Sequence, residues 1–485
     1  MKPILPIVLF ASASAAHAAE KPLSLHPDNP HYFLFRGKPT VLVTSAEHYG
    51  AILNRDFDAD KYLAELHKHG LNLTRTFTGV YCEDANAFGI TRNTLAPADG
   101  KLLCPWARSE MPGYAGGGNT FDLTQWDDAY FKRLKAFLTH AGKRGIVVEL
   151  VLFCPFYEDS MWKLSPMNTV NNVNGVGKVA RDAVYNRDKN GDLQSAQETL
   201  VKKLVAELNE FDNLYFEVCN EPYYGGVTDD WQRRIIDVIV DAEKPLPTKH
   251  LISLNIANGS KKIEKPHPAA SIFNFHYASP PTAVEENFAL NKVIGENETG
   301  FKGASDTQYR MEAWEFLLAG GGLYNNLDYS FAVGHEDGMY KYPDKTPGGG
   351  NTGFRSQIHV LKEFLDGFDY IRMNPDDGVV TELSRCPLKF SEWLPWLFQG
   401  GLPAKGRARV LSEPGKQYAL YFFGGPSAKP LLALPAGEYL TEWLSPVTGK
   451  VLQSEAITAK GMPVELASPK FDPDIALRIK RVEVK

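Results

Sequence analysis

The sequence has little of several features that assign a protein to a functional class. Its 485 residues include only 5 cysteines, too few for a disulfide-dense scaffold. It carries no Lys/Arg cluster and a formal net charge of −6, which argues against nucleic acid as the main partner. Beyond the N-terminus no apolar run reaches the roughly 18 residues of a membrane span. We therefore expect a soluble globular protein with no nucleic-acid partner and no membrane span.

Motifs for cofactors and for several reaction types are also missing. Residues 45–50, after the first predicted strand, contain no G-x-G-x-x-G turn, so a dinucleotide is not expected. No G-x-S-x-G elbow is present, which places an ester or amide hydrolase last among the candidates. The segment 335–338 (His-Glu-Asp-Gly) lacks the spacing of a zinc or calcium site. We expect neither a cofactor nor a metal.

The first 18 residues have the pattern of an export signal. Lys2 precedes the short apolar run Ile4–Phe10, and small residues lead to Ala18, so cleavage before Ala19 is predicted. The mature protein would then be secreted or periplasmic. Such a compartment permits disulfides, and Cys82 and Cys104 share one irregular region in which they could pair.

The main part of the chain alternates apolar runs with helical patterns. Helices are predicted over Asp60–His69 and after Thr124, which would act as the N-cap of the second. Continuous apolar runs are typical of parallel strands buried on both faces. Eight such runs occur: Thr40–Ser45, Leu71–Phe77, Ile146–Phe153, Leu214–Cys219, His250–Asn255, Ile272–Tyr277, Lys292–Glu296 and Gly322–Tyr329. Eight alternations favour an α/β fold with a (β/α)8 TIM barrel over residues 19–400, preceded by a short β lead.

Two long segments and the C-terminal part of the chain complete the predicted organisation. Val80–Asn119 and Pro155–Gln194 each follow a strand and are candidate walls of a cleft. Beyond residue 400, short alternating runs are separated by Gly and Pro. This spacing predicts a small antiparallel β-sandwich domain over residues 401–485. Its role is either to pack against the barrel or to bind carbohydrate.

Carboxylates stand where two of the predicted barrel strands end. Glu221 follows the fourth strand, between Asn220 and a strand-breaking proline, while Glu296 and Glu298 end the seventh. Catalytic groups of such barrels lie at the C-terminal ends of strands. Strands four and seven face one another across the mouth, so two carboxylates there can act on one glycosidic bond. Strand alternation would aim Glu296 and Glu298 to the same side, so parity does not choose between them.

These residues resemble a motif set of the clan A retaining glycoside hydrolases, especially the cellulase-like family 5. Asn220-Glu221-Pro222 with Glu298-Thr-Gly300 carries the resemblance, together with Gly70–Arg75 and His276-Tyr277. The resemblance implies Glu221 as general acid/base and Asn220 as the partner of a sugar 2-hydroxyl. It implies Glu298 as nucleophile, with Glu296 as the rival because Gly295-Glu296 also resembles a family pattern.

The same resemblance implies further roles in substrate binding. Arg75 would keep the nucleophile ionised and Tyr277 would hydrogen-bond it, while a desolvated Glu221 would stay protonated at neutral pH. His276, in the same segment as Tyr277, would be a substrate-binding residue. The histidine usual after strand three and the tryptophan usual on strand eight are absent. The sugar platform must therefore differ, and Tyr329 could supply it. His48 sits where such a barrel would recognise a non-reducing-end sugar.

Two functions from different classes remain open on this evidence. The first is a secreted retaining β-glycosidase that hydrolyses a β-linked oligo- or polysaccharide by double displacement through a covalent glycosyl-enzyme. The second is a catalytically inactive barrel that binds carbohydrate. The pair formed by Glu221 and a glutamate of the seventh strand favours the first.

Overall fold

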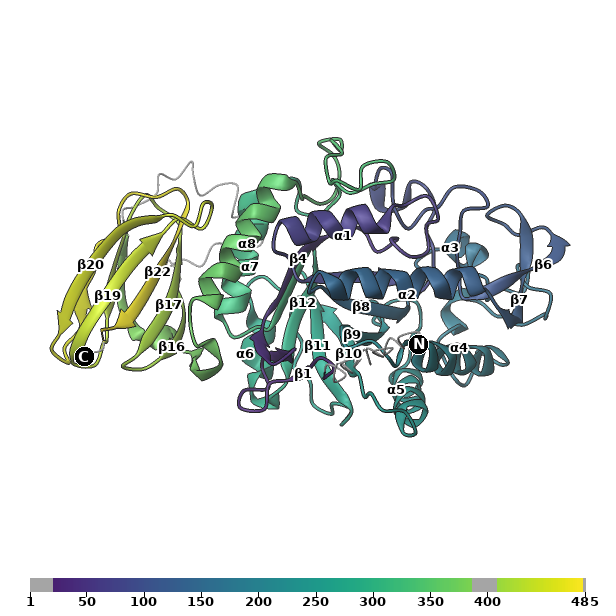
Figure 1. The fold of residues 1–485 in the computed structure, drawn as a ribbon, viewed down its shortest axis with the longest axis horizontal. Coiled ribbons are helices and arrows are strands. Elements are labelled where there is room, and N and C mark those ends of the chain that lie inside the picture. Colours follow the sequence, from purple (N-terminus) through teal and green to yellow (C-terminus); the bar gives the residue numbers. More distant parts are fainter. Residues whose placement is uncertain (1–20, 386–407, 483–485) are drawn as a thin grey trace, which may run out of the picture.

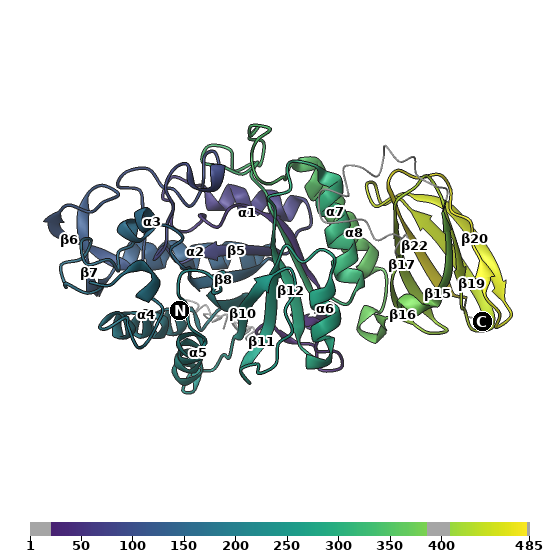
Figure 2. The same cartoon turned by 180° about the vertical axis from the view of Figure 1, so that it is seen from behind.

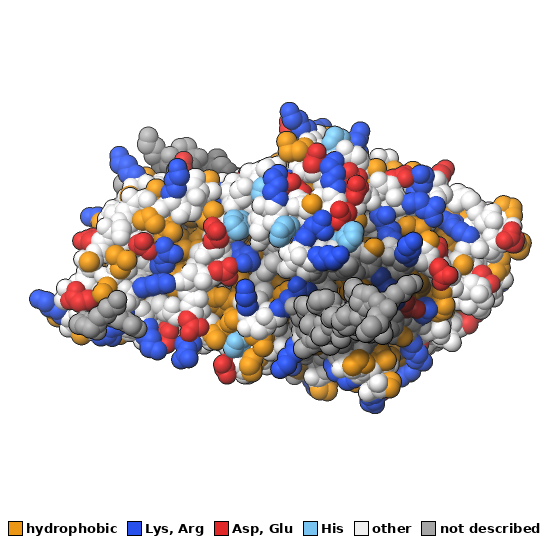
Figure 3. Space-filling model, viewed as in Figure 1, with side chains coloured by type: hydrophobic (Ala, Val, Ile, Leu, Met, Phe, Trp, Pro, Cys, Tyr) orange, Lys and Arg blue, Asp and Glu red, His pale blue; other side chains and the backbone are white. Residues whose placement is uncertain are grey.

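A computed structural model describes residues 21–385 and 408–482. The predicted export signal and the boundary predicted at residue 401 lie outside these residues. Within them, no helix combines the length and the apolar character needed to cross a bilayer. Figure 1 shows a barrel in the middle, a β module at one end and the β6–β7 hairpin at the other. On the face drawn in Figure 3, basic and acidic side chains are interspersed.

Eight parallel strands form the barrel, which confirms the predicted fold class. In chain order they are β4 (Leu42–Ala46), β5 (Leu73–Phe77), β8 (Val147–Phe153), β9 (Leu214–Cys219), β10 (Leu251–Asn258), β11 (Ala270–His276), β12 (Val293–Thr299) and β13 (Leu323–Leu327). The sheet order is β4-β13-β12-β11-β10-β9-β8-β5. Each predicted apolar run overlaps one of these strands, because a strand covered on both faces is mostly apolar.

The side chain of Asn72 bridges the seam between β4 and β5. Its Oδ1 accepts from the N–H of Val43 at 2.8 Å, and its Nδ2 donates to the carbonyl of Val41 at 2.9 Å. The N–H of Asn72 also donates to the carbonyl of Val43 at 3.3 Å. One amide thus takes the place of ladder bonds where the two ends of the sheet meet.

Helices cover the outside of the barrel (Figures 1 and 2). They are α1 (Ala59–Lys68), α2 (Asp128–Lys143), α4 (Leu193–Leu208), α5 (Asp229–Glu243), α6 (Thr282–Asn287), α7 (Asp306–Leu318) and α8 (Thr352–Asp366). The short helix α3 (Asp159–Leu164) lies instead in the long segment that follows β8. Residues 259–269 join β10 to β11 without a helix. The prediction of Thr124 as the N-cap of α2 is wrong: Thr124 lies in strand β7, and Asp127 accepts the N–H groups of Ala129 and Tyr130 instead.

A small sheet closes the bottom of the barrel. It consists of β1 (Ser24–Leu25), β2 (Phe33–Phe35) and β3 (Lys38–Thr40). Phe33 and Phe35 pack in one buried cluster with Leu42, Leu73 and Val293, which begin barrel strands. This apolar plug leaves the opposite, C-terminal ends of the strands as the open face.

The long segment after β5 carries a hairpin of β6 (Trp106–Pro112) and β7 (Asn119–Trp126), and the one after β8 carries α3. Cys82 and Cys104 are both buried and both free. The possible disulfide between them is therefore not formed. Burial raises the pKa of each thiol to about 12, so neither is a thiolate at neutral pH.

The C-terminal module consists of two antiparallel sheets, which confirms the predicted second architecture. Its strands are β14 (Asn374–Pro375), β15 (Val380–Arg385), β16 (Ala408–Glu413), β17 (Gln417–Phe423), β18 (Ala428–Leu432), β19 (Gly437–Leu444), β20 (Val451–Ala459), β21 (Val464–Glu465) and β22 (Asp474–Arg481). One sheet has the order β14-β16-β17-β22-β19-β20 and the other β15-β18-β21. Strands β14 and β15 precede residue 401, so the module takes up chain from before the predicted boundary.

The module packs on helix α7 of the barrel. The ring of Trp314 stacks on Tyr421 of β17 at 5.2 Å, and Arg310 contacts Asp474 of β22 at 2.8 and 2.9 Å. All four side chains are buried. The contact is both apolar and ionic, and it lies away from the open face of the barrel (Figure 1).

Candidate active site

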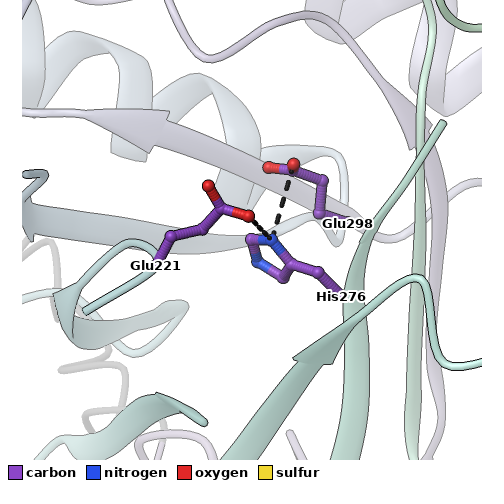
Figure 4. Close-up of side chains that lie close together, drawn as sticks. All are labelled: Glu221, His276 and Glu298. Atoms are coloured by element: carbon purple, nitrogen blue, oxygen red, sulfur yellow. Dashed lines mark hydrogen bonds and ion pairs between the residues drawn. The ribbon is translucent and has the colours of Figure 1, made fainter. Parts of the chain in front are cut away.

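Glu221, His276 and Glu298 meet at the C-terminal ends of β9, β11 and β12, as Figure 4 shows. The Nδ1 of His276 lies 3.1 Å from Glu221 Oε1 and 3.5 Å from Glu298 Oε1. One carboxylate oxygen of each glutamate and one ring nitrogen lie within 4.8 Å of one another. All three side chains are at most one-tenth exposed. The two strand-end carboxylates predicted from the sequence are therefore brought together.

Glu298 is surrounded by hydrogen-bond donors. Tyr277 donates to its Oε1 at 2.6 Å, Tyr49 donates to its Oε2 at 2.8 Å, and Arg75 Nη1 donates to Oε2 at 3.3 Å. These three donors hold both carboxylate oxygens in fixed directions. Such a fixed orientation suits a nucleophile.

Glu221 also accepts several hydrogen bonds. Tyr157 donates to its Oε2 at 2.5 Å and Tyr223 to its Oε1 at 3.1 Å. Burial by itself would raise the pKa of Glu221, but His276 and the two tyrosine hydroxyls outweigh it and hold the pKa below its usual value. This differs from the expectation that desolvation keeps Glu221 protonated at neutral pH, because the donors are stronger than the burial.

Three residues that contact this pair have positive φ angles. Tyr49 has φ 61°, Glu221 has φ 36° and Tyr277 has φ 52°. Each follows a barrel strand by one to three residues. Such backbone is uncommon for residues other than glycine, and it clusters at functional sites.

Glu296 does not join the site, which corrects the expectation that it points the same way as Glu298. Phe275 pairs with Glu296 and His276 with Glu298, so Asn297 is an extra residue in β12. This bulge breaks the alternation. Glu296 is fully buried and accepts the N–H of Ala278 at 2.7 Å. Burial and the charge of Glu312 raise its pKa well above the usual value, which does not favour nucleophilic attack by Glu296.

A polar network lies directly beneath the site, and the sequence did not predict it. Arg75 Nη2 donates to Glu217, and its Nε lies 3.7 Å from Glu149 Oε2. Asn274 and Asn297 each donate to both glutamates. Burial and the neighbouring Glu217 raise the pKa of Glu149 well above its usual value. Glu149 and Glu217 had no signal in the sequence, since each lies within an apolar strand run.

The remaining predicted site residues fall into two groups. Asn220, Tyr277 and His48 line a cavity of about 610 Å³ together with both glutamates. Arg75 and His276 are fully buried, so they act on the glutamates rather than on a substrate. Tyr329, predicted as a sugar platform, is 3% exposed and lies behind His48, with 5.8 Å between the rings.

Three exposed aromatic side chains line this cavity, and a fourth, Tyr223, lies next to it through its hydrogen bond to Glu221. The exposed fractions are 43% for Phe88, 37% for Tyr223, 46% for Tyr224 and 43% for Phe301. Exposed large aromatics grouped at a concave site are typical of ligand-binding surfaces. Tyr223 could have been suspected from its position two residues after Glu221, whereas Phe88 and Phe301 lie in irregular segments with no pattern.

Comparison with known proteins finds structures with a similar fold but low sequence identity. No protein-family model matches the chain, and no curated protein matches it. Among solved structures, a glycoside hydrolase family 5 protein from Bacteroides vulgatus ATCC 8482 is 13% identical, with a TM-score of 0.62 over 95% of this chain and 93% of that chain. A further glycoside hydrolase structure is 13% identical, with a TM-score of 0.61 over 95% of this chain and 97% of that one. The chain has a glycoside hydrolase family 5-like fold, a (β/α)8 barrel followed by a C-terminal β-sandwich.

Proposed function

We propose that this protein is a retaining glycosidase that hydrolyses a β-linked oligo- or polysaccharide. The observation that carries the proposal is the approach of Glu221 and Glu298, with one oxygen of each within 4.8 Å of the other. Retaining glycosidases hold their two carboxyl groups about 5–5.5 Å apart, while inverting enzymes need about 6.5–9.5 Å to admit a water. The family 5-like fold supports a glycosidase, and the hydrogen bonds that Tyr49, Tyr277 and Arg75 donate to Glu298 support its role as nucleophile.

The reaction runs in two steps. Glu298 attacks the anomeric carbon while Glu221 gives its proton to the leaving oxygen, so the glycosidic C–O bond breaks as an ester bond to Glu298 forms. Glu221 then takes a proton from water, whose oxygen attacks the anomeric carbon and releases Glu298 as a carboxylate. The donors around Glu221 favour its ionised form, which is the form that the second step requires.

Covalent labelling tests the nucleophile. An activated 2-deoxy-2-fluoro β-glycoside of a sugar that the enzyme cleaves is expected to trap the glycosyl-enzyme, and peptide mass spectrometry is expected to find the added mass on Glu298. Glu298→Gln should remove both labelling and turnover, whereas the matched variant Glu296→Gln should keep both. Label on Glu296, or a product with inverted anomeric configuration by NMR, would contradict the proposal.

The alternative is a barrel that binds carbohydrate without cleaving it. The two hypotheses differ in a screen of β-glycans and 4-nitrophenyl β-glycosides: a glycosidase releases product, and Glu221→Gln should bind the same sugar without releasing it. Binding by the wild type with no product from any sugar would favour the binding protein. A cation could also be held by the ligand atoms of Glu221, His276 and Glu298. Because the proposed reaction needs no metal, we expect a chelator to leave turnover unchanged.

Export is part of the same proposal. Residues 1–18 would direct the chain out of the cytoplasm, where a polysaccharide substrate is available. N-terminal sequencing of the secreted or periplasmic protein should begin at Ala19. Recovery of a chain that begins at Met1 in the cytoplasm would refute this part.

A further inference from the structure

The cavity has two chemically different ends. The aromatic side chains at its mouth are more than one-third exposed, while His48 and Glu83 at the other end are 8% and 5% exposed. Glu83 accepts from Tyr81 at 3.0 Å, from Asn93 at 2.5 Å and from His48 Nε2 at 3.2 Å. This buried carboxylate takes no part in the proposed reaction, and the sequence gave no sign of it.

The buried end lies on the side of the nucleophile. Tyr49, which donates to Glu298, has its ring 5.3 Å from that of His48. Burial would lower the pKa of His48, but the carboxylates of Glu83 and Glu298 raise it. On the other side, Tyr223 hydrogen-bonds both Glu221 and Asn258, at the exposed aromatic mouth. The acid protonates the leaving oxygen, so the leaving group belongs at the mouth and the sugar that becomes attached to Glu298 belongs beside His48.

Two loops close the cavity beyond His48 and Glu83. Tyr340, after β13, donates to Thr91 Oγ1 at 3.4 Å, and Arg92 lies 5.2 Å over its ring. Thr94 is fixed to the turn after β4 by donating to Glu47 at 2.5 Å and to the carbonyl of His48 at 2.8 Å. Asn93, Thr94 and Leu95 are at most 5% exposed. Residues 91–95 and Tyr340 are thus packed against one another at the side of the cavity lined by His48, Glu83 and Leu95.

We propose that Glu83 and His48 bind hydroxyl groups of the terminal sugar at the non-reducing end, and that the enzyme therefore removes sugars from chain ends. The proposal rests on the proposed glycosidase function and adds the substrate class. A carboxylate oxygen can accept two hydrogen bonds, and Tyr81 takes one of the two at Oε1. A sugar hydroxyl that donates to the second acceptor position of Glu83 Oε1 fits this side chain, and His48 Nδ1, which has no hydrogen-bond partner among the described residues, is left for a second hydroxyl. Hydrogen bonds of this kind select for free hydroxyls.

The test uses the wild-type enzyme on β-linked oligosaccharides labelled at the reducing end, with the sugar identified in the glycoside screen. Chain-end action is expected to release the terminal sugar first, so the labelled product shortens from its far end and the viscosity of the polymer falls slowly. A substrate whose terminal non-reducing hydroxyls are methylated should resist cleavage. Labelled fragments of all lengths from the start, or cleavage of the methylated chain, would overturn the proposal.

Variants test the two side chains. Glu83→Gln should lower kcat/KM for the matching aryl glycoside about 10- to 100-fold, as expected for a lost charged hydrogen bond. Glu110→Gln, at an exposed carboxylate of strand β6 outside the lining of this cavity, should stay within about twofold. An unchanged kcat/KM in Glu83→Gln would overturn the role of Glu83. If the wild type cleaves no β-glycoside, the glycosidase function itself fails, which is a different result from internal cleavage.

Discussion

Replacing Arg75 should destabilise the barrel in a way that depends on pH. Its guanidinium is fully buried and contacts Glu217 and Glu298, with Glu149 at 3.7 Å. Arg75→Met keeps most of the side-chain volume and leaves these carboxylates without their cation. Removing one partner of a buried ion pair costs about 3–5 kcal/mol. We expect the free energy of unfolding at pH 7 to fall by about that amount.

The direction in which the free energy of unfolding changes with pH follows from the carboxylates that have lost the Arg75 cation. Without the cation, burial raises their folded-state pKa above the unfolded value of about 4.3. The folded variant then binds more protons than the unfolded chain, so its free energy of unfolding falls as pH rises. The deficit relative to wild type should therefore be largest near neutral pH and shrink towards about pH 4.

Urea unfolding followed by tryptophan fluorescence at both pH values measures this deficit. Arg133→Met is a matched control, because Arg133 is also part-buried but donates to four backbone carbonyls, those of Ala51, Ile52, Asn54 and Phe57. Its deficit should change little with pH. An Arg75→Met deficit below about 1 kcal/mol, or one equal at both pH values, would refute the ionic account of this cluster.

Three further predictions concern the seam, the acid and the cysteines. Asn72→Ala should lower the free energy of unfolding by about 1–3 kcal/mol in the same urea assay, because backbone groups of β4 lose their partners; a neutral effect would show that the seam closes without it. The lowered pKa of Glu221 predicts that kcat/KM falls as pH rises from the acidic range, and Tyr157→Phe should move that falling limb to higher pH because a donor is lost; a shift to lower pH would contradict this. Cys82 and Cys104 should react with a thiol reagent after unfolding without any reductant, and silence there would indicate a disulfide.

The barrel strands were predictable because burial on both faces is visible in sequence. Each of the eight apolar runs overlaps a strand, and in most the ends agree within a few residues. Strand β20 was missed because most of its residues, such as Val451 and Leu452, are exposed, so no apolar pattern marks it. The N-cap of α2 was misplaced because Thr124 and Asp127 are both good caps, and only the pairing of β7 with β6 decides between them.

Only the site residues that stand at the end of a predicted strand could be located from the sequence. A carboxylate at the end of a strand, such as Glu221, can be located from sequence, since parallel strands end at one face. Glu83 lies in an irregular segment and meets His48 through loop packing that no local pattern encodes. The direction of a side chain in β12 depends on a bulge, and the sequence around Asn297 carries no mark of it.

That bulge links the nucleophile to the polar core beneath it. In a regular strand Asn297 and Glu298 would point to opposite faces, yet Asn297 donates to Glu149 and Glu217 inside the barrel while Glu298 faces the cavity. Interiors of such barrels are usually filled by branched aliphatic side chains, and buried ions are costly unless they are paired. Arg75 contacts Glu217 in the core and Glu298 at the site. The polar layer thus fixes the Arg75 guanidinium, which orients the nucleophile. An apolar replacement of the core would be expected to gain stability and lose the alignment of Glu298.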